Sequence, residues 1–577
     1  MKTIRERTGA VALVEALEKA GTEVLFGYPG GAVIDIFDSL KDAKFRFVLG
    51  RHEQGCAHMA DGYARSSGKV GVCLVTSGPG ATNVVTGLGT AYLDGVPMVM
   101  ITGQVPLAQI GTDAFQEADM SGISRAVTKH SFLVQSADEI PETVAQAFYI
   151  ATHGKPGPVV IDIPKNCQQA LTKAQYPERV NLRAYHPEYT ARPQQIARFA
   201  KLLNEAKRPV IYAGGGAIAA FASGDLTALA RKAQIPVATT LMGLGSFDQR
   251  DPLSLGMAGM HGAPCANYAI DEADLIVAMG VRFSDRVTGK ISKYAKKAKI
   301  VHIDCNPAEV DKNVTVHLGI VADVRDVIAN VNSRVKANEH PEWLARIAQW
   351  KQDYPISYQP LHPGVIMPQQ AIEAIDKVSD GEAIVVTDVG QQQMWASQYV
   401  THRYPRRFLT SGGMGTMGFG IPAAIGAALA RPDLKTIAIC GDGGAQMTFE
   451  EIVVAVEHKL PITFVVINNG CLGMVRQWQE LFYDKRYSGS ILTVKGRLAN
   501  ERLEQDLAYD YLPDLVKLAE AHGAEAYRVI DPAKLDAVLK KAVRSARTTF
   551  VEVIVEPRAN VYPMQPGGQP VEGMIFE

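Results

Sequence analysis

The sequence contains no long hydrophobic run and no excess of one charge. Its longest apolar stretches, such as residues 98–102 and 462–467, are far shorter than the roughly 20 residues that a membrane-spanning helix needs. Lys and Arg number 59 against 60 Asp and Glu, so the 577 residues carry a net charge of −1. These absences argue against a transmembrane protein and against binding to nucleic acid or a membrane surface through a broad basic face.

Cysteine is scarce, and no targeting segment is evident. The seven cysteines are scattered without close pairs, which indicates neither a disulfide framework nor a zinc site. The N-terminal residues are charged and lead directly into an amphipathic pattern, without the apolar run of a secretory signal or the Arg/Ser-rich character of a transit segment. We therefore expect the chain to begin at its mature N-terminus and to be cytoplasmic.

Short apolar runs alternate with helical patterns along most of the chain. The strand-like runs in its first half are residues 23–27, 70–76, 98–102, 159–163, 209–213, 235–239, 275–279 and 300–304. Buried runs separated by helices are typical of parallel sheets. The sequence therefore predicts an α/β fold with doubly wound parallel sheets.

Two polar, proline-containing stretches divide the chain. Length alone suggests roughly four folding units of about 150 residues, but residues 174–195 and 340–364 lack sustained periodicity and indicate linkers. We therefore expect three domains and a C-terminal tail, at residues 1–172, 190–336, 365–556 and 557–577. The first and third domains share a pattern of strand, glycine-rich turn, helix, proline and strand.

The sharpest local motif is Gly441-Asp442-Gly443-Gly444 after a strand, followed by Asn468-Asn469 at the end of the next strand. Glycines in such a turn let backbone N–H groups approach a diphosphate, and carboxylate and amide oxygens suit Mg²⁺. For Gly-Asp-Gly alone, a plain turn with Asp442 as a helix cap is the better interpretation. The two asparagines at this spacing favour the diphosphate site.

This motif pair resembles the signature of thiamine diphosphate-dependent enzymes. The resemblance implies that Asp442, Asn469 and the backbone carbonyl of Cys471 hold Mg²⁺ against the diphosphate. It also implies that Glu53 hydrogen-bonds N1′ of the aminopyrimidine and so favours the tautomer that removes the C2 proton. Met417 matches the bulky residue beneath the bent cofactor. Taken alone, Glu53 would be a solvated surface acid. For Met417 alone, ordinary helix-start packing and a close backbone approach at the surrounding glycines are equally good interpretations.

Further motifs narrow the resemblance. In order along essentially the whole chain they are Tyr28-Pro-Gly-Gly-Ala32, Arg51-His-Glu-Gln54, Ser77-Gly-Pro-Gly-Ala-Thr-Asn83, Phe115-Gln-Glu117, Gly157-Pro158, Ile163-Pro-Lys165, Arg282-Phe283, Asp285-Arg-Val-Thr-Gly289 and Leu472-Gly-Met-Val-Arg-Gln-Trp478. Together they look like the catalytic large subunit of acetohydroxyacid synthase, also called acetolactate synthase.

The resemblance implies a carboligase. Such an enzyme decarboxylates pyruvate on thiamine diphosphate and transfers the hydroxyethyl unit to a second 2-keto acid. A second pyruvate gives 2-acetolactate and 2-ketobutyrate gives 2-aceto-2-hydroxybutyrate, in the first common step of valine, leucine and isoleucine biosynthesis. In the family the cofactor lies between such domains of two different chains, so the resemblance implies a homodimer or tetramer in which Glu53 and Asp442 come from different chains. A small regulatory subunit is common in the family.

The resemblance assigns further residues to the cofactor and substrates. Gln116 and Lys165 would line the channel to the thiazolium with Phe115, and Arg286 would grip the acceptor's carboxylate with its planar fork. Trp478 would shape the pocket for the acceptor's alkyl group. Without the resemblance, Arg286 would be a surface ion pair and Trp478 a core residue. The other thiamine diphosphate positions are Pro29, Gly30, Val389, Gly390, Gln391, Gln392, Gly415, Met417, Gly441, Gly443, Gly444, Leu472, Gly473 and Met474.

The family's middle domain binds FAD, which takes no net part in the carboligation. The matching positions are Lys155, Gly214, Gly215, Gly216, His261, Gly262, Gly280, Arg282, Asp285, Arg286, Asp304 and Asp323. Asp304 ends a strand, where it could accept a ribose hydroxyl. Four features depart from the family: Lys155 replaces an arginine and loses its bidentate fork, Ser284 replaces an aspartate, Gln392 replaces a histidine, and residues 490–511 form a longer stretch.

Relatives with the same fold remain as alternatives, namely a flavin-free catabolic acetolactate synthase, glyoxylate carboligase and pyruvate oxidase. Glyoxylate carboligase is disfavoured because it lacks the glutamate that Glu53 supplies. Gln477-Trp478 and the middle segment disfavour the flavin-free form, which Lys155 nevertheless keeps open. A non-catalytic protein of this fold would have lost Glu53, Asp442 or Asn469, and all three are present.

Overall fold

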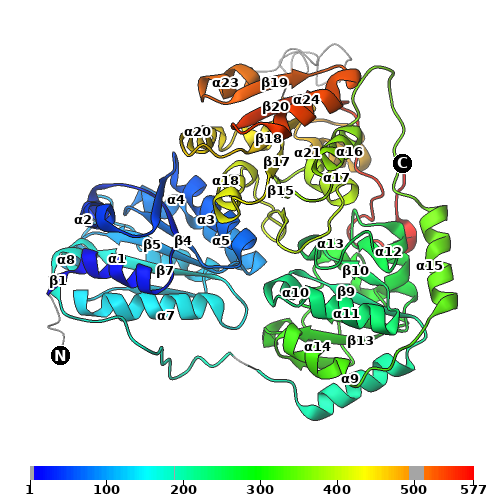
Figure 1. Cartoon of the computed structure of the whole chain (residues 1–577), viewed down its shortest axis with the longest axis horizontal. Helices are drawn as coiled ribbons and strands as arrows, with labels where there is room; N and C mark the ends of the chain where they lie inside the picture. Colours follow the sequence, from blue (N-terminus) through cyan, green and yellow to red (C-terminus); the bar gives the residue numbers. More distant parts are fainter. Residues whose placement is uncertain (1–5, 188, 493–512) are drawn as a thin grey trace.

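A computed structural model describes residues 6–187, 189–492 and 513–577. It contains three six-stranded sheets, which we assign to a first, a middle and a third unit along the chain (Figure 1). Every strand pair within these sheets is parallel. The predicted α/β fold with three doubly wound parallel sheets is therefore confirmed. Among the described residues, no helix is both long and apolar enough to cross a membrane.

The first unit has the strand order β3-β2-β4-β5-β7-β6. Its strands are β2 (Val24–Tyr28), β3 (Arg46–Leu49), β4 (Gly71–Val75), β5 (Met98–Gln104), β6 (His130–Leu133) and β7 (Pro158–Pro164). Its helices are α1 (Gly9–Lys19), α2 (Ile34–Ser39), α3 (Glu53–Ser67), α4 (Pro79–Asn83), α5 (Val85–Asp94), α6 (Met120–Ser124), α7 (Ile140–Thr152) and α8 (Lys165–Gln169). Apolar side chains of α1 and α7 pack on one face of the sheet and those of α3 and α5 on the other. A short antiparallel pair, β1 (Arg7–Thr8) with β8 (Leu171–Thr172), joins the two ends of the unit.

The middle unit has the order β11-β10-β9-β12-β13-β14. Its strands are β9 (Pro209–Ala213), β10 (Val237–Thr239), β11 (Ser254–Met257), β12 (Leu275–Met279), β13 (Lys299–Asp304) and β14 (Leu318–Val321). Its helices are α9 (Pro193–Glu205), α10 (Gly215–Ala219), α11 (Ser223–Ala233), α12 (Pro264–Glu272), α13 (Asp285–Thr288), α14 (Val324–Asn332) and α15 (Pro341–Asp353). The helices α9, α11 and α14 pack in one core, and α12 and α15 pack in a second.

The third unit has the order β16-β15-β17-β18-β20-β19. Its strands are β15 (Ile384–Thr387), β16 (Phe408–Leu409), β17 (Thr436–Gly441), β18 (Thr463–Asn468), β19 (Glu525–Val529) and β20 (Thr549–Ile554). Its helices are α16 (Pro368–Ser379), α17 (Gln391–Tyr399), α18 (Gly420–Ala430), α19 (Asp442–Ala445), α20 (Ile452–Glu457), α21 (Gly473–Phe482), α23 (Leu515–Ala521) and α24 (Pro532–Arg544).

The first and third units have the same topology. If the strands of each unit are ranked along the chain, both sheets run second, first, third, fourth, sixth, fifth, whereas the middle sheet runs third, second, first, fourth, fifth, sixth. The pattern shared by their sequences is therefore one part of a shared fold, and it places the turn after β4 and the turn after β17 at equivalent sheet edges.

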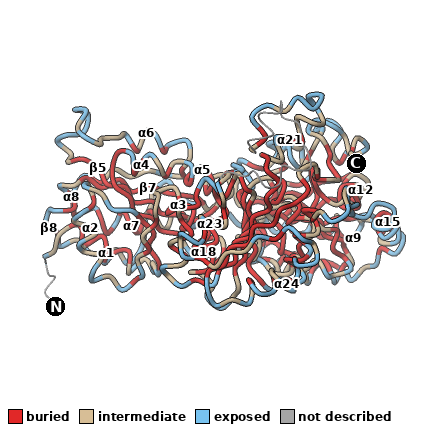
Figure 2. Tube along the Cα trace, turned by 90° about the horizontal axis from the view of Figure 1, so that it is seen from above, coloured by how far each residue is buried: buried red, intermediate tan, exposed pale blue. Residues whose placement is uncertain are grey.

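The first and third units meet through α3 and α18. One apolar core contains residues of both helices, and Figure 2 shows buried segments where the two labels lie close together. A Cβ at Gly62 would overlap the backbone oxygen of Ala423, and a Cβ at Gly426 would overlap that of Met59. Only glycine allows so close a helix crossing, so the two units are held face to face by backbone contact.

One of the two predicted linkers is wrong in part. Within residues 340–364, α15 forms a 13-residue helix whose Trp343 and Trp350 are buried in the middle unit. The Nε1 of Trp343 donates to the backbone oxygen of Pro209 at 3.1 Å. Pro341 was interpreted as a break in structure, but it occupies the first turn of the helix, where no backbone N–H is needed. In the other linker, the described residues 174–187 and 189–192 form no helix or strand, and α9 begins at Pro193 (Figure 1).

Candidate cofactor site

A pocket lies at the carboxyl ends of β15, β17 and β18, where the loops of the third unit converge. Ligands of open parallel sheets bind at this edge. Most thiamine diphosphate positions predicted in this unit line it, together with the unpredicted Trp395, Ile467 and Val475; the predicted ones are Val389, Gly390, Gln391, Gln392, Met417, Gly441, Asp442, Gly443, Gly444, Asn469, Cys471, Leu472, Gly473 and Met474. The structure thus brings together residues from four separate segments.

Asp442 and Asn469 present oxygen atoms in this pocket, and both side chains are buried. The carboxylate of Asp442 accepts from Gly443 N at 3.0 Å and from Gly470 N at 2.9 Å, and Asn469 Oδ1 accepts from Cys471 N at 3.1 Å. Burial, with a smaller contribution from the charge of Glu552, raises the pKa of Asp442 to about 7. A bound cation would offset that cost, so this donor set fits Mg²⁺, which prefers such oxygens.

Gln392 supplies an unpaired donor at the same place. Its side chain is 6% exposed, and among the described residues its Nε2 has no hydrogen-bond partner. A buried amide N–H without a partner costs free energy unless a ligand accepts from it. The amide lies against Gly390 and Gly441, since a Cβ on Gly441 would be 3.1 Å from Gln392 Oε1. Where the family has histidine, this chain therefore offers a donor that suits an anionic diphosphate oxygen.

Asp388 holds the loops that form the pocket, and sequence reasoning missed it. Its buried carboxylate accepts from Val389 N at 2.8 Å, from Gly418 N at 3.0 and 3.1 Å, and from Gly420 N at 2.9 Å. The Met417 side chain lies beside the glycine-rich turn, because a Cβ on Gly443 would be 3.6 Å from Met417 Cε. Asp388 thereby fixes the backbone at Gly418, directly after Met417, and at Gly420.

Glu53 lies in the first unit and belongs to a second group of predicted residues. It is the first residue of α3, and its Oε2 accepts from Asn83 Nδ2 at 3.0 Å. Its Oε1 lies 3.2 Å from where a Cβ of Gly80 would stand. Every residue that lines the pocket belongs to the third unit, so Glu53 is not among them.

Other predicted residues lie in the first unit with Glu53. Pro29 and Gly30 follow β2, and a Cβ on Gly30 would be 2.5 Å from the Thr76 side chain. Gln116 has a positive φ of 60° and lies against Gly78, and Lys165 Nζ donates to Gly31 O at 3.2 Å. Phe115 is 87% exposed. With Glu53 they make up the first-unit group of candidate residues, which we call the second candidate half-site.

Glu451 connects the third unit to the start of α3, and no motif in the sequence pointed to it. Its buried carboxylate accepts from Arg51 N at 3.0 and 3.1 Å and from His52 N at 2.9 Å, just before Glu53. A carboxylate at a helix N-terminus satisfies free N–H groups and interacts favourably with the helix dipole. Burial raises the pKa of Glu451 to about 7.

The two residues predicted to bind the acceptor substrate are in contact. The guanidinium of Arg286, on α13 of the middle unit, lies 5.7 Å from the ring centre of Trp478, on α21 of the third unit. His261 is buried close to Arg286. The residue before it, Met260, donates its backbone N–H to Arg286 O at 2.8 Å. Burial lowers the pKa of His261 to about 4, so it is neutral near pH 7. Gly415, which does not line the pocket, takes a positive φ of 67°.

The predicted flavin positions form two clusters and several separate positions. Lys155 of the first unit interacts electrostatically with Arg282 and Asp304 of the middle unit, and burial raises the pKa of Asp304 to about 6. Gly214 and Gly216 pack against Gly280 so closely that a Cβ at any of them would overlap backbone or come within about 2.6 Å of it, so they serve chain packing as well. Asp323 caps α14 through Arg325 N at 2.8 Å. The remaining positions are Gly215, which begins α10, Gly262, which follows His261, and Asp285, which lies 3.6 Å from the Arg286 guanidinium.

Family models match the chain in the same three places. The N-terminal TPP binding domain of thiamine pyrophosphate enzymes matches residues 7–123, the central domain residues 196–331 and the C-terminal TPP binding domain residues 388–553, together more than half of the chain. The chain belongs to the thiamine pyrophosphate enzyme family. The resemblance predicted from the sequence motifs is therefore confirmed.

Curated relatives of this thiamine pyrophosphate enzyme match over nearly their full length. The Haemophilus influenzae acetolactate synthase large subunit is 43% identical over 583 residues, which cover 99% of each chain. The probable acetolactate synthase large subunit of Methanocaldococcus jannaschii is 44% identical over 572 residues, covering 97% of this chain and 94% of its own. The Escherichia coli isozyme 3 large subunit is 43% identical over 580 residues and 98% of each chain. Most of the long stretch at residues 490–511 lies outside the described residues.

Proposed function

We propose that this chain is the catalytic subunit of an acetolactate synthase. It decarboxylates pyruvate and joins the remaining two-carbon unit to a second pyruvate or to 2-ketobutyrate. The observation that carries the proposal is the third-unit pocket with Asp442, Asn469 and the unpaired Gln392 donor, in a chain similar over nearly its whole length to proteins named acetolactate synthase.

Thiamine diphosphate and Mg²⁺ are the ligands that fit this pocket. Asp442, Asn469 Oδ1 and the Cys471 carbonyl hold the metal, and Gln392 Nε2 donates to the diphosphate. When bound, the cofactor supplies the nucleophilic carbon and the electron sink for loss of CO₂. Met417, fixed through Gly418 by Asp388, supports it from the glycine-rich side.

Glu53 holds the proton that the reaction needs at the aminopyrimidine nitrogen. Asn83 occupies Oε2, which leaves Oε1 for N1′. Because Glu53 lies in the first unit and the pocket in the third, we infer a homodimer in which Glu53 of one chain serves the pocket of the other. Sedimentation of a fully active monomer would contradict this. The relatives' names, which include "large subunit", support association with a small regulatory subunit.

Arg286 and Trp478 receive the acceptor. The guanidinium pairs with the substrate carboxylate, and the adjacent indole packs against its alkyl group. Gln116, Lys165 and Phe115 line the approach from the first unit. We further propose that FAD binds without redox turnover between the first and middle units, where Lys155 and Arg282 meet its phosphates and Asp304 accepts a ribose hydroxyl.

The test is a spectrum of the purified protein together with product analysis on pyruvate, thiamine diphosphate and Mg²⁺. A yellow protein that forms acetolactate without consuming oxygen is the expected result. Oxygen consumption with acetate or acetyl phosphate as product would indicate an oxidase. A colourless protein that forms acetolactate would indicate the flavin-free form.

A further inference from the structure

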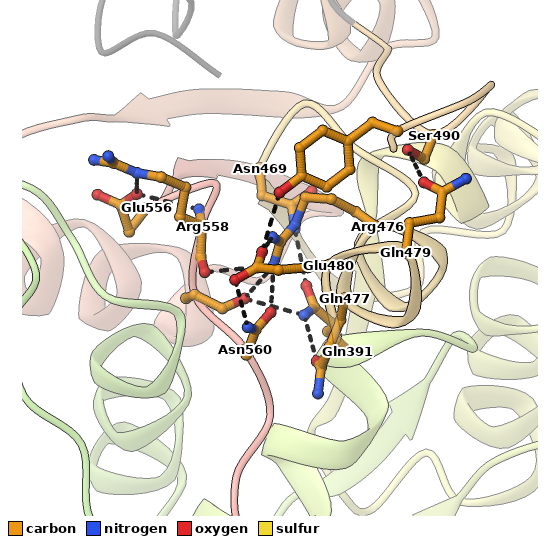
Figure 3. Close-up of polar contacts among 12 residues, drawn as sticks. Gln391, Asn469, Arg476, Gln477, Gln479, Glu480, Ser490, Glu556, Arg558 and Asn560 are labelled. Carbon is orange, nitrogen blue, oxygen red and sulfur yellow. Dashed lines mark hydrogen bonds and ion pairs between the residues drawn. The ribbon is translucent and has the colours of Figure 1, made fainter. Parts of the chain in front are cut away.

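A chain of buried side-chain amides connects the C-terminal segment to Asn469. Gln391 bonds to Gln477 on one side and to Asn469 on the other, and Figure 3 draws these three residues together with Asn560 and Arg476. Gln477 and Gln391 are both buried. This inference deepens the proposed metal site and rests on it. We refer to Gln477, Gln391 and Asn469 as the amide relay.

The backbone of Val561 fixes the orientation of Gln477. Val561 N donates to Gln477 Oε1 at 2.9 Å, and Gln477 Nε2 donates to Val561 O at 3.2 Å. A backbone N–H can only donate and a backbone carbonyl can only accept, so the reversed amide would face like against like at both contacts. Gln477 Oε1 therefore points toward Gln391.

Gln391 in turn has only one orientation that pairs its atoms. Its Nε2 donates to Gln477 Oε1 at 2.9 Å and to the backbone oxygen of Ala559 at 3.0 Å. Both of its N–H groups are used by acceptors, which leaves Oε1 to accept from Asn469 Nδ2 at 3.2 Å. A Cβ at Gly473 would overlap Gln391 Oε1, so glycine at this position leaves room for the last bond.

We propose that the amide relay makes Gln477 and Gln391 positioning residues for the metal, so that residues 559–561 are part of the metal site. With Nδ2 committed to Gln391, Asn469 Oδ1 is turned to the side of Cys471, whose N–H it accepts at 3.1 Å. Oδ1 and not the NH₂ group then faces a cation held with Asp442. A reversed Asn469 would present donor hydrogens to the metal and lose a ligand.

Arg476 anchors the same segment. Its fully buried guanidinium donates to Ala559 O at 3.0 Å and to Asn560 Oδ1 at 2.5 Å, and it pairs with Glu480 (Figure 3). Ala559 O thus accepts from both Arg476 and Gln391. The position of this one carbonyl is set by a buried cation, which makes the acceptor that orients Gln391 rigid.

The test measures metal affinity directly. With thiamine diphosphate saturating, Mn²⁺ is titrated and free Mn²⁺ is followed by its electron paramagnetic resonance signal. In Gln477→Met the side chain keeps its volume beside the sulfur of Met564, but its hydrogen bonds with Gln391 and with the backbone of Val561 are lost. We expect Mn²⁺ to bind roughly 10- to 100-fold more weakly, the range found for residues that orient metal ligands. Equal affinity in the variant and the wild type would overturn the relay.

Gln398→Met is the matched control. Gln398 Nε2 donates to Tyr562 O at 3.2 Å and to His261 O at 3.0 Å, so this change also loosens the C-terminal segment but leaves the amide relay intact. We expect its Mn²⁺ affinity within about twofold of the wild type, because the contacts of Asn469 are unchanged. A loss of Mn²⁺ affinity as large as that of Gln477→Met would show that metal binding depends on docking of the C-terminal segment and not on the amide relay. That outcome would contradict the proposal.

A second background isolates the orientation of Asn469. In Asn469→Asp both side-chain atoms are oxygens, so Gln477→Met should now weaken Mn²⁺ binding by less than about threefold. An unchanged loss in that background would overturn the relay. If Gln477→Met fails to fold, hydrogen exchange of the wild type decides: Mn²⁺ with thiamine diphosphate should slow exchange at Val561, and no change would contradict the proposal. A wild type that binds no Mn²⁺ with thiamine diphosphate would contradict the proposed function itself.

Discussion

Replacing Glu451 with glutamine should remove a pH-dependent contribution to stability at the contact between the first and third units. The carboxylate accepts from the backbone N–H groups of Arg51 and His52, and the charges nearest to it are Glu450 and Arg51. Burial raises its pKa from the ordinary value of 4.5 to about 7. The folded protein therefore keeps a proton that the unfolded chain has released.

The sign and size follow from linkage. The stability that this group contributes is complete below the unfolded pKa, near 4.5, and is lost as the pH rises through the folded pKa, near 7. At 1.36 kcal/mol for each pKa unit, the loss is about 3 kcal/mol over the whole range, and about 2.5 kcal/mol between roughly pH 5 and pH 8. Glutamine does not titrate, so the free energy of unfolding of the variant relative to that of the wild type should rise by this amount as the pH increases.

Thermal unfolding of both proteins across this pH range measures the effect. Over 577 residues, an unfolding entropy of about 2.1 cal/mol/K per residue means that each kcal/mol shifts the Tm by about 0.8 °C, so the Tm of Glu451→Gln minus that of the wild type should rise by about 2 °C from about pH 5 to about pH 8. Glu450→Gln removes the same charge from the neighbouring, half-buried residue and should show a nearly constant difference. A constant offset for Glu451→Gln as well would refute the reasoning.

Three further changes test the candidate site and the contact between units. Glu53→Gln should slow C2–H exchange of bound thiamine diphosphate by orders of magnitude, measured by NMR, with little effect on its affinity; unchanged exchange would remove Glu53 from its role. Trp478→Leu should lower the share of 2-aceto-2-hydroxybutyrate when pyruvate and 2-ketobutyrate compete, and an unaltered product ratio would count against the contact with Arg286. Gly426→Ala should destabilise by about 2 kcal/mol or more in denaturant titration, because the new Cβ overlaps Met59 O; Ala427→Gly on the same helix should cost only about 1 kcal/mol or somewhat more.

The central strands were predictable almost residue by residue because they are short, buried and flanked by turn residues, whereas the strands β6, β11 and β14 were not predicted. The runs at 209–213 and 275–279 coincide with β9 and β12. The helix α15 was not predictable in the same way, because prolines around it outweighed the weak periodicity of two buried tryptophans. The local sequence pattern predicts an element when neighbouring residues determine its backbone geometry. It failed for α15, which is stabilised by contacts with residues that are distant in the sequence.

The same distinction applies to the site. Asp442, Asn469 and the glycines around them form a compact motif whose spacing places them at one sheet edge. Asp388, Glu451 and Gln477 act on residues about 30, 400 and 80 positions away, so no spacing in the sequence points to them. Each is a buried polar group that satisfies backbone N–H or C=O groups of another segment, and such partners become visible only in the folded chain.

The shared topology of the first and third units explains why the candidate residues divide into two half-sites. Equivalent sheet edges carry Glu53 in one unit and Asp442 in the other, while α3 and α18 hold the two units of one chain in direct backbone contact. Glu451 of the third unit holds the backbone just before the helix that begins with Glu53. In the proposed homodimer, the third unit of one chain would therefore bind one cofactor and also position Glu53 of the same chain, which serves the cofactor bound by the partner chain. A change in the third unit on cofactor binding would act on the partner site through Glu451, by way of the backbone at residues 51–53.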